Sequence, residues 1–244
     1  MISQTKRIIL LLDESGSMFS QKNDVITGVN EMIRSQRELQ ESSIEFSIIK
    51  FNTNVTKIRS DMLQNVKPFS GRDYSPSGGT ALYDAIGMTI NKYSNDVGTI
   101  MIVVTDGMEN SSREYNRKQM IDMINHQRLT KNWNFIYLSE DPTTVKQGES
   151  IGINNSVKQC SNTFVGHQQC GKVIGSSSLQ NFIKDVSSGK TTQNYDEYCS
   201  AGNFAKVNKK NDQGWENFNT FNNLQTSKYA TPFSYTSNSK PNYF

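Results

Sequence analysis

An unbroken apolar run, residues 8–12, constrains the fold more than any other part of this sequence. Five consecutive aliphatic residues without alternation predict a strand covered on both faces, as in the centre of an α/β sheet. The run ends in Asp13, Ser15 and Ser17, with Gly16 allowing a sharp turn. Open α/β sheets bind ligands at the carboxyl ends of their strands, where this cluster is expected to lie. A turn with an ordinary helix cap explains the same residues, because Ser and Asp are common cap residues.

Two distant segments extend this cluster of oxygen atoms. Thr80 follows a glycine pair and precedes a helical pattern, whereas residues 99–105 form a second apolar strand pattern that ends in Asp106 and Gly107. Three loops would thus supply two carboxylates and three hydroxyls, hard oxygen donors of the kind that Mg²⁺ prefers. The candidate metal ligands are Asp13, Ser15, Ser17, Thr80 and Asp106.

The rest of the first 188 residues alternates strand and helix patterns, which predicts an α/β fold: a Rossmann-like, three-layer α/β/α domain. The polar, alternating strand at 55–58 follows the apolar strand at 44–51 after a short turn. It is therefore expected to be an antiparallel edge strand on a mostly parallel sheet. The other predicted strands are 6–12, 99–105, 134–138 and a weak one at 156–160. The predicted helices are 23–40, 81–93, one led by a Ser111-x-x-Glu114 capping box, one capped by Asp141-Pro142, and one containing Leu179, Phe182, Ile183 and Val186.

The five candidate ligands, in this order, resemble the metal-ion-dependent adhesion site of von Willebrand factor type A (vWA) domains. The resemblance runs from about Lys6 to about Lys184. It implies a bound Mg²⁺ or Mn²⁺, held by hydroxyls of the Ser15, Ser17 and Thr80 type, with the two aspartates acting largely through water. It also implies a protein partner that supplies an Asp or Glu to the ion.

The stretches 79–87 and 106–115 refine this resemblance. They look most like compact intracellular vWA proteins of bacteria and their phages, and less like secreted adhesins. The match weakens after Asp141, where Asn and Gln replace the alanine-rich helices of that group. This departure affects the expected partner surface more than the metal site.

Charge and composition exclude several classes of partner. Lys and Arg number 26 against 23 Asp and Glu, a net charge of +3, which favours neither nucleic acid nor a membrane surface. The N-terminal apolar run is short and leads straight into acidic residues, unlike a signal peptide, and no run approaches the ~20 apolar residues of a transmembrane helix. We therefore expect a cytoplasmic protein, which a virion can still incorporate.

Composition divides the chain into a vWA domain at residues 1–188 and an extended or disordered tail at 189–244. The tail is rich in Asn, Ser, Thr and Lys, with scattered aromatic residues and few aliphatic ones, so it lacks a core of its own. Two interpretations remain open. The tail is either disordered, or an arm whose aromatic side chains dock on a partner or a neighbouring subunit in an assembly.

Two further functions compete with metal-dependent protein binding. The domain can serve as a scaffold in an assembly, such as a phage virion, with the tail as a clamp. A metal-dependent hydrolase needs a general base, and Glu14 is the only candidate beside the motif. The simpler interpretation is that Glu14 is a solvated loop residue, or a mock ligand that takes the place of the partner carboxylate at the ion. His126 and His167 lie outside the metal loops, so no enzyme activity is expected.

The three cysteines leave one question open. Cys160, His167, Cys170 and Cys199 supply the atoms of a structural zinc site, but their spacing matches no common zinc pattern. Free thiols in a reducing compartment explain the same residues.

Overall fold

The computed structural model describes residues 6–38, 44–139, 141–153, 174–188, 190, 195 and 198. The chain divides into two units, residues 1–205 and 206–244, and all described residues belong to the first. None of the helices in these described ranges is both long and apolar enough to cross a membrane.

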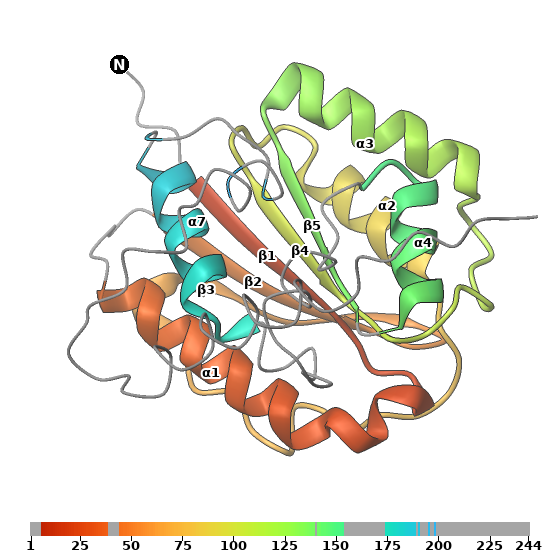
Figure 1. The fold of residues 1–244 in the computed structure, drawn as a ribbon, viewed down its shortest axis with the longest axis horizontal. Helices are drawn as coiled ribbons and strands as arrows, with labels where there is room; N and C mark the ends of the chain where they lie inside the picture. The colour runs from red at the N-terminus through yellow and green to blue at the C-terminus, as the bar shows by residue number, and fades with distance from the viewer. Residues whose placement is uncertain are drawn as a thin grey trace, which may run out of the picture. The chain divides into compact units, whose positions relative to one another are not determined.

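A five-stranded sheet forms the middle of the first unit, with strand order β3-β2-β1-β4-β5 (Figure 1). The neighbours β1–β2, β1–β4 and β4–β5 are parallel, whereas β3 is antiparallel to β2 at the edge. The predicted antiparallel edge strand is therefore confirmed. The strands are β1 Lys6–Asp13, β2 Ile44–Phe51, β3 Val55–Met62, β4 Ile100–Val104 and β5 Asn134–Leu138.

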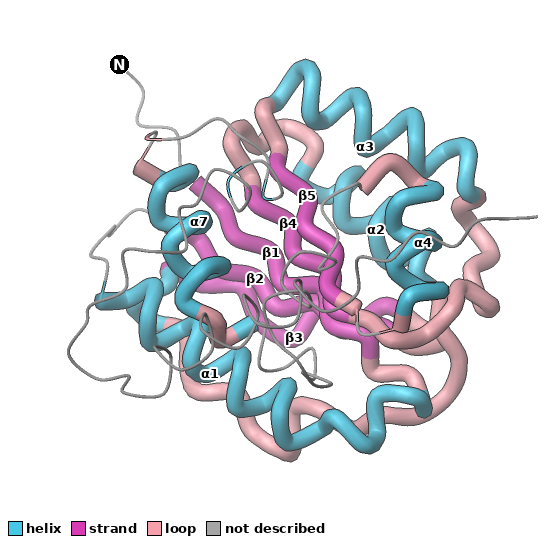
Figure 2. Tube along the Cα trace, viewed as in Figure 1, coloured by secondary structure: helices cyan, strands magenta, loops and turns pink. Residues whose placement is uncertain are grey.

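Helices cover both faces of the sheet and complete the three predicted layers (Figure 2). α1 and α7 lie on one face, while α2, α3 and α4 lie on the other (Figure 1). The helices are α1 Lys22–Glu38, α2 Leu82–Tyr93, α3 Arg117–Lys131, α4 Pro142–Ser150 and α7 Ser177–Ser187, with short 3₁₀ helices η1 Gly16–Gln21 and η2 Leu63–Asn65.

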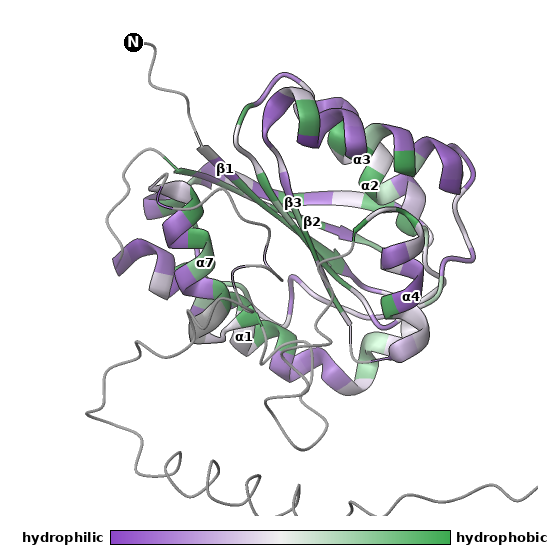
Figure 3. Ribbon diagram, turned by 45° about the horizontal axis from the view of Figure 1, so that its top comes forward, coloured by the Kyte–Doolittle hydropathy of each residue, from purple (hydrophilic) through white to green (hydrophobic). Residues whose placement is uncertain are grey.

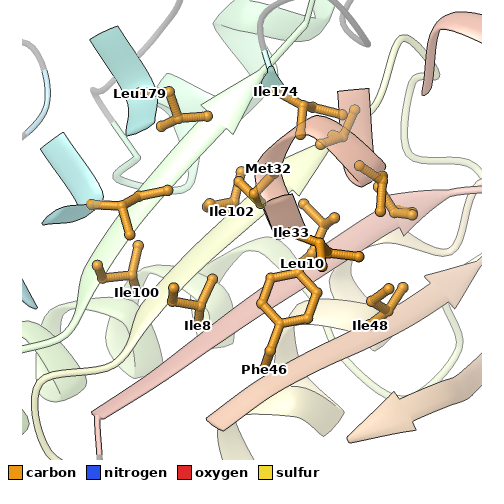
Figure 4. Packing of buried hydrophobic residues seen from close by; sticks show 14 of the residues in the cluster. Ile8, Leu10, Met32, Ile33, Phe46, Ile48, Ile100, Ile102, Ile174 and Leu179 are labelled. Carbon is orange, nitrogen blue, oxygen red and sulfur yellow. The ribbon is translucent and has the colours of Figure 1, made fainter. Parts of the chain in front are cut away.

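The apolar run of β1 is central because its alternate residues enter two separate cores. Ile8, Leu10 and Leu12 pack in the core beneath α1 and α7. α1 and α7 both carry hydrophobic positions (Figure 3), and Met32 and Ile33 of α1 and Leu179 of α7 lie near Ile8 and Leu10 (Figure 4). Ile9 and Leu11 enter the core on the α2 and α3 face. All five side chains are buried, which explains why the run shows no alternation.

The predicted capping box at the start of α3 is wrong in position. The helix begins later, at Arg117, where Asn116 and Gln119 form the capping box reciprocally. Ser111 and Glu114 lie in the preceding loop, because the carboxylate of Asp84 accepts hydrogen bonds from the backbone N–H groups of residues 113–115. That carboxylate holds the loop in a non-helical path. The weak strand predicted at 156–160 lies outside the described residues.

The folded unit continues past residue 188, the predicted end of the domain. Tyr195 and Tyr198 are both buried and belong to the core beneath α1 and α7. Their rings pack edge-on against Phe182 of α7, with centroids 5.1 and 5.3 Å away, and the Tyr198 hydroxyl donates to Asp185 Oδ2 at 2.7 Å. We therefore expect the folded domain to end nearer residue 205 than residue 188.

This boundary predicts different stabilities for two shortened proteins. A chain ending at Ala205 should unfold at the same denaturant concentration as the full chain. A chain ending at Ser188 loses both tyrosines from the core and should be less stable by about 2–5 kcal/mol. Urea unfolding followed by circular dichroism tests this, and equal stability of the two shortened proteins would restore the boundary at 188.

Candidate metal site

The candidate ligands meet at the carboxyl ends of two neighbouring strands. Asp13 is the last residue of β1, and Asp106 follows β4, which pairs with β1 in parallel. The chain leaves β1 toward β2, on the opposite side from β4, so this crevice is a topological switch point of the sheet. Ser15 lies just before η1 and Ser17 lies within it, and Thr80 lies just before α2.

The space around Gly107 shows how closely three segments approach one another. A methyl group at its Cα would lie 2.5 Å from Thr80 Oγ1, 3.0 Å from Asp13 Oδ2 and 3.2 Å from Ser15 Oγ. Ser15 Oγ in turn lies 3.0 Å from Ser17 Oγ. Oxygen atoms that are far apart in sequence therefore surround one small space, which stays open because residue 107 has no side chain.

Asp13 is held rigidly in this space. Its side chain is fully buried, Oδ1 accepts a hydrogen bond from Ser15 N at 2.7 Å, and Oδ2 accepts one from Thr105 Oγ1 at 2.6 Å. The hydroxyl of Tyr74 donates to the Asp13 carbonyl oxygen at 2.5 Å. Burial raises the pKa of the carboxyl group to about 6, against the hydrogen bonds that lower it, with a small further increase from the nearby charge of Asp106.

One oxygen of the Asp106 carboxylate is held by a hydrogen bond, to which Gln21 Nε2 donates at Oδ2 over 2.8 Å. The other oxygen, Oδ1, is buried and has no hydrogen-bond partner among the described residues. None of the ion pairs between described residues involves Asp13 or Asp106. Two neighbouring carboxylates, one of which has an unpartnered buried oxygen, and three hydroxyls fit a small divalent cation.

A loop after Asp106 fixes the backbone of Thr80. Thr80 N donates to Asn110 Oδ1 at 2.8 Å, and Thr80 O accepts from the backbone N–H groups of Asn110 and Ser111 at 3.0 and 3.2 Å. Glu109 holds this loop, because its carboxylate accepts from Ser111 N and from Tyr83 N at the start of α2. The Thr80 and Asp106 segments are thus joined before any ion binds.

The residues that position the candidate ligands carry little signal in the sequence. Thr105 and Gln21 hold the two aspartates, Asn110 holds Thr80, and Tyr74 holds the end of β1. Thr105 carries a weak signal, since a polar residue ends the apolar run of β4 beside Asp106. For the other three, no spacing or pattern in the sequence indicates the contact.

Glu14 is neither a solvated loop residue nor a mock ligand, which corrects the sequence-based interpretation. Its side chain is buried, and Oε1 forms an ion pair with Lys50 Nζ at 2.7 Å and accepts from Ser75 N at 2.5 Å. The carboxylate therefore joins β2 to the loop before Thr80. A charge-paired, hydrogen-bonded carboxylate is a poor general base.

The histidines and cysteines that the sequence singled out are not part of the described site. His126 is exposed on α3, whereas Cys160, His167, Cys170 and Cys199 lie outside the described residues. Within the described ranges, no group of three or more His, Cys, Asp and Glu side chains could hold a metal ion.

A five-stranded α/β/α domain with this oxygen cluster at the switch point defines a vWA-type domain. The family "VWA domain containing CoxE-like protein" matches residues 2–130, slightly more than half of the 244-residue chain. The chain belongs to this family. A comparison with curated proteins gave no match.

Solved structures share the fold at low sequence identity. The pilus adhesin SpaC of Lactobacillus rhamnosus GG, in its open conformation, matches with a TM-score of 0.55 at 15% identity, over 79% of this chain and 31% of that one. The PilB minor pilin of Streptococcus sanguinis matches with a TM-score of 0.52 at 12% identity, over 75% of this chain and 62% of that one. The chain thus spans about a third to two thirds of the length of these structures.

Adding one methyl group at Gly107 should block the ion. In Gly107→Ala, the new carbon occupies the space between the oxygens of Thr80, Asp13 and Ser15, so we expect no measurable Mg²⁺ binding by calorimetry. Gly71→Ala is the matched control, because nothing lies within 4 Å of a methyl group at that exposed glycine. Equal Mg²⁺ affinity of the two variants would contradict this placement of the ion.

The raised pKa of Asp13 predicts how the metal-free protein responds to pH. The folded state binds the proton more tightly than the unfolded chain, so this group contributes stability below about pH 4 that is lost as the pH rises through about 6. Asp13→Asn removes this loss, and in EDTA its melting temperature should exceed that of the original protein at about pH 7.5 but not at about pH 4. A lower melting temperature for Asp13→Asn at the higher pH would refute the assignment.

Proposed function

We propose that this protein is a non-enzymatic, divalent-metal-dependent binding module that recruits a carboxylate of a protein partner to a Mg²⁺ or Mn²⁺ ion. The observation that carries the proposal is the convergence of Asp13, Ser15 and Thr80 oxygens around the open space at Gly107. Membership of the vWA family supports the general role in protein interaction.

The ion would be held by hydroxyl oxygens of Ser15, Ser17 and Thr80, with Asp13 and Asp106 acting through water. When bound, it would supply an electrophilic centre for an incoming oxygen ligand. Hydroxyls donate no formal charge, so an ion held mainly by them gains more from a partner carboxylate than one surrounded by carboxylates. The interaction strengthens further because Asp13, Ser15 and Thr80 are buried, which lowers the effective dielectric constant on that side of the site.

The fixed positions of the protein groups also favour this role. Asp13 is held by Ser15 and Thr105, and Thr80 is held by Asn110, so these ligands need little ordering when the ion arrives. Interactions that are ordered in advance cost less conformational entropy on binding. A preassembled site of this kind suits reversible recognition of a partner.

The alternatives are less well supported. Hydrolysis needs a base beside the ion, and the carboxylate of Glu14 is already committed to Lys50 and Ser75. A scaffold role in an assembly, such as a virion, depends on the tail at 189–244, most of which lies outside the described residues. This second role is compatible with metal-dependent binding by the domain.

Calorimetry with Mg²⁺ and Mn²⁺ tests the first step of the proposal. Asp13→Ala and Asp106→Ala should each weaken binding by at least about tenfold, since each removes a negative charge from the site. Asp122→Ala is the matched control, because Asp122 is an exposed aspartate on α3 and its loss should leave the affinity unchanged. Unchanged affinity in both site variants would overturn the proposal.

A further inference from the structure

Large apolar side chains are exposed beside the candidate metal site. Among the described residues, three large hydrophobic side chains are exposed: Phe19 at 72%, Met108 at 45% and Leu129 at 87%. Phe19 lies two residues after Ser17, and Met108 lies two residues after Asp106 and next to Gly107. Two of the three thus lie within two residues of candidate ligands: Phe19 in η1, which follows β1, and Met108 in the loop that follows β4.

Apart from the candidate ligands Asp13 and Asp106, each charged side chain on the same loops is held by an ion pair or by hydrogen bonds. Within 13–20, 75–80 and 105–112, all of which the structure describes, there is no Lys, Arg or His. Besides Asp13 and Asp106, the charged residues there are Glu14, which pairs with Lys50, and Glu109, whose carboxylate accepts hydrogen bonds from its own loop and from Tyr83 N. Around the ion, the surface therefore offers neutral polar groups and two apolar side chains.

We infer that Phe19 and Met108 form an apolar rim that selects the partner. The inference rests on the proposed function and adds the class of ligand: a protein segment in which a large aliphatic or aromatic residue lies next to the Asp or Glu that reaches the ion. The partner's carboxylate is complementary in charge to the ion. The neutral rim disfavours segments that carry further charges around the acidic residue, because those charges would lose their hydration without gaining a partner.

The rim adds affinity that the ion alone does not provide. An exposed aromatic or methionine side chain that becomes buried on binding makes the binding free energy more favourable, because apolar surface is removed from water. Such residues are enriched at protein interfaces. A carboxylate is common to all acidic proteins, so the ion distinguishes poorly among them. Adjacent apolar contacts supply that discrimination.

A random peptide library displayed on phage tests this inference, because the selection itself finds the sequences that bind. The full-length protein is immobilised and selected in Mg²⁺, and bound phage are released with EDTA. The inference predicts enriched sequences with an Asp or Glu next to a large apolar residue. A synthetic peptide of the enriched sequence should then bind Phe19→Ser and Met108→Ser about tenfold more weakly than the original protein.

Leu129→Ser is the matched control, because it removes an even more exposed apolar side chain from α3 and should leave the affinity unchanged. The outcomes separate the two claims. Acidic peptides that need Mg²⁺ but show no apolar neighbour, or that bind all three variants equally, would overturn the rim while leaving the proposed function intact. If no peptide is released by EDTA, both the proposed function and the rim are contradicted.

Discussion

The rest of the site depends on the buried carboxylate of Asp13. It is fully buried at the end of the central strand, and no ion pair between described residues involves it. Burying a carboxylate costs several kcal/mol unless the charge is compensated. Hydrogen bonds from Ser15 N and Thr105 Oγ1 compensate in part, but burial still raises its pKa to about 6. A cation in the adjacent space would supply the missing compensation, and the stability that the metal-free protein loses by burying this charge would then favour binding of the ion.

Much of the fold could be predicted from the sequence because its strongest signals are physical necessities. A strand buried on both faces needs an unbroken apolar run, and β1 and β4 both have one. A half-exposed edge strand needs polar residues, which identified β3. The candidate ligands followed from the same logic, since polar residues placed directly after neighbouring parallel strands must lie close together. Their role as metal ligands remains a prediction.

The sequence could not predict contacts that depend on the tertiary structure. Gln21 and Asp106 are 85 positions apart, and Thr80 and Asn110 are 30 apart, so no local pattern relates them. The start of α3 was misplaced because Asp84, from another helix, takes up the backbone N–H groups that a capping box would use. Tyr195 and Tyr198 looked like part of an aromatic tail, and only their packing against Phe182 places them in the core.

The central claim is that a divalent ion occupies the space beside Gly107. The most direct measurement is a crystal structure of the Mn²⁺-soaked protein with an anomalous difference map, which locates the metal without assumptions about its ligands. The account predicts one strong peak among Asp13, Ser15, Ser17, Thr80 and Asp106, with the nearest hydroxyl oxygens at about 2.0–2.3 Å. A map with no peak there at saturating Mn²⁺, or with its strongest peak elsewhere on the molecule, would contradict the account.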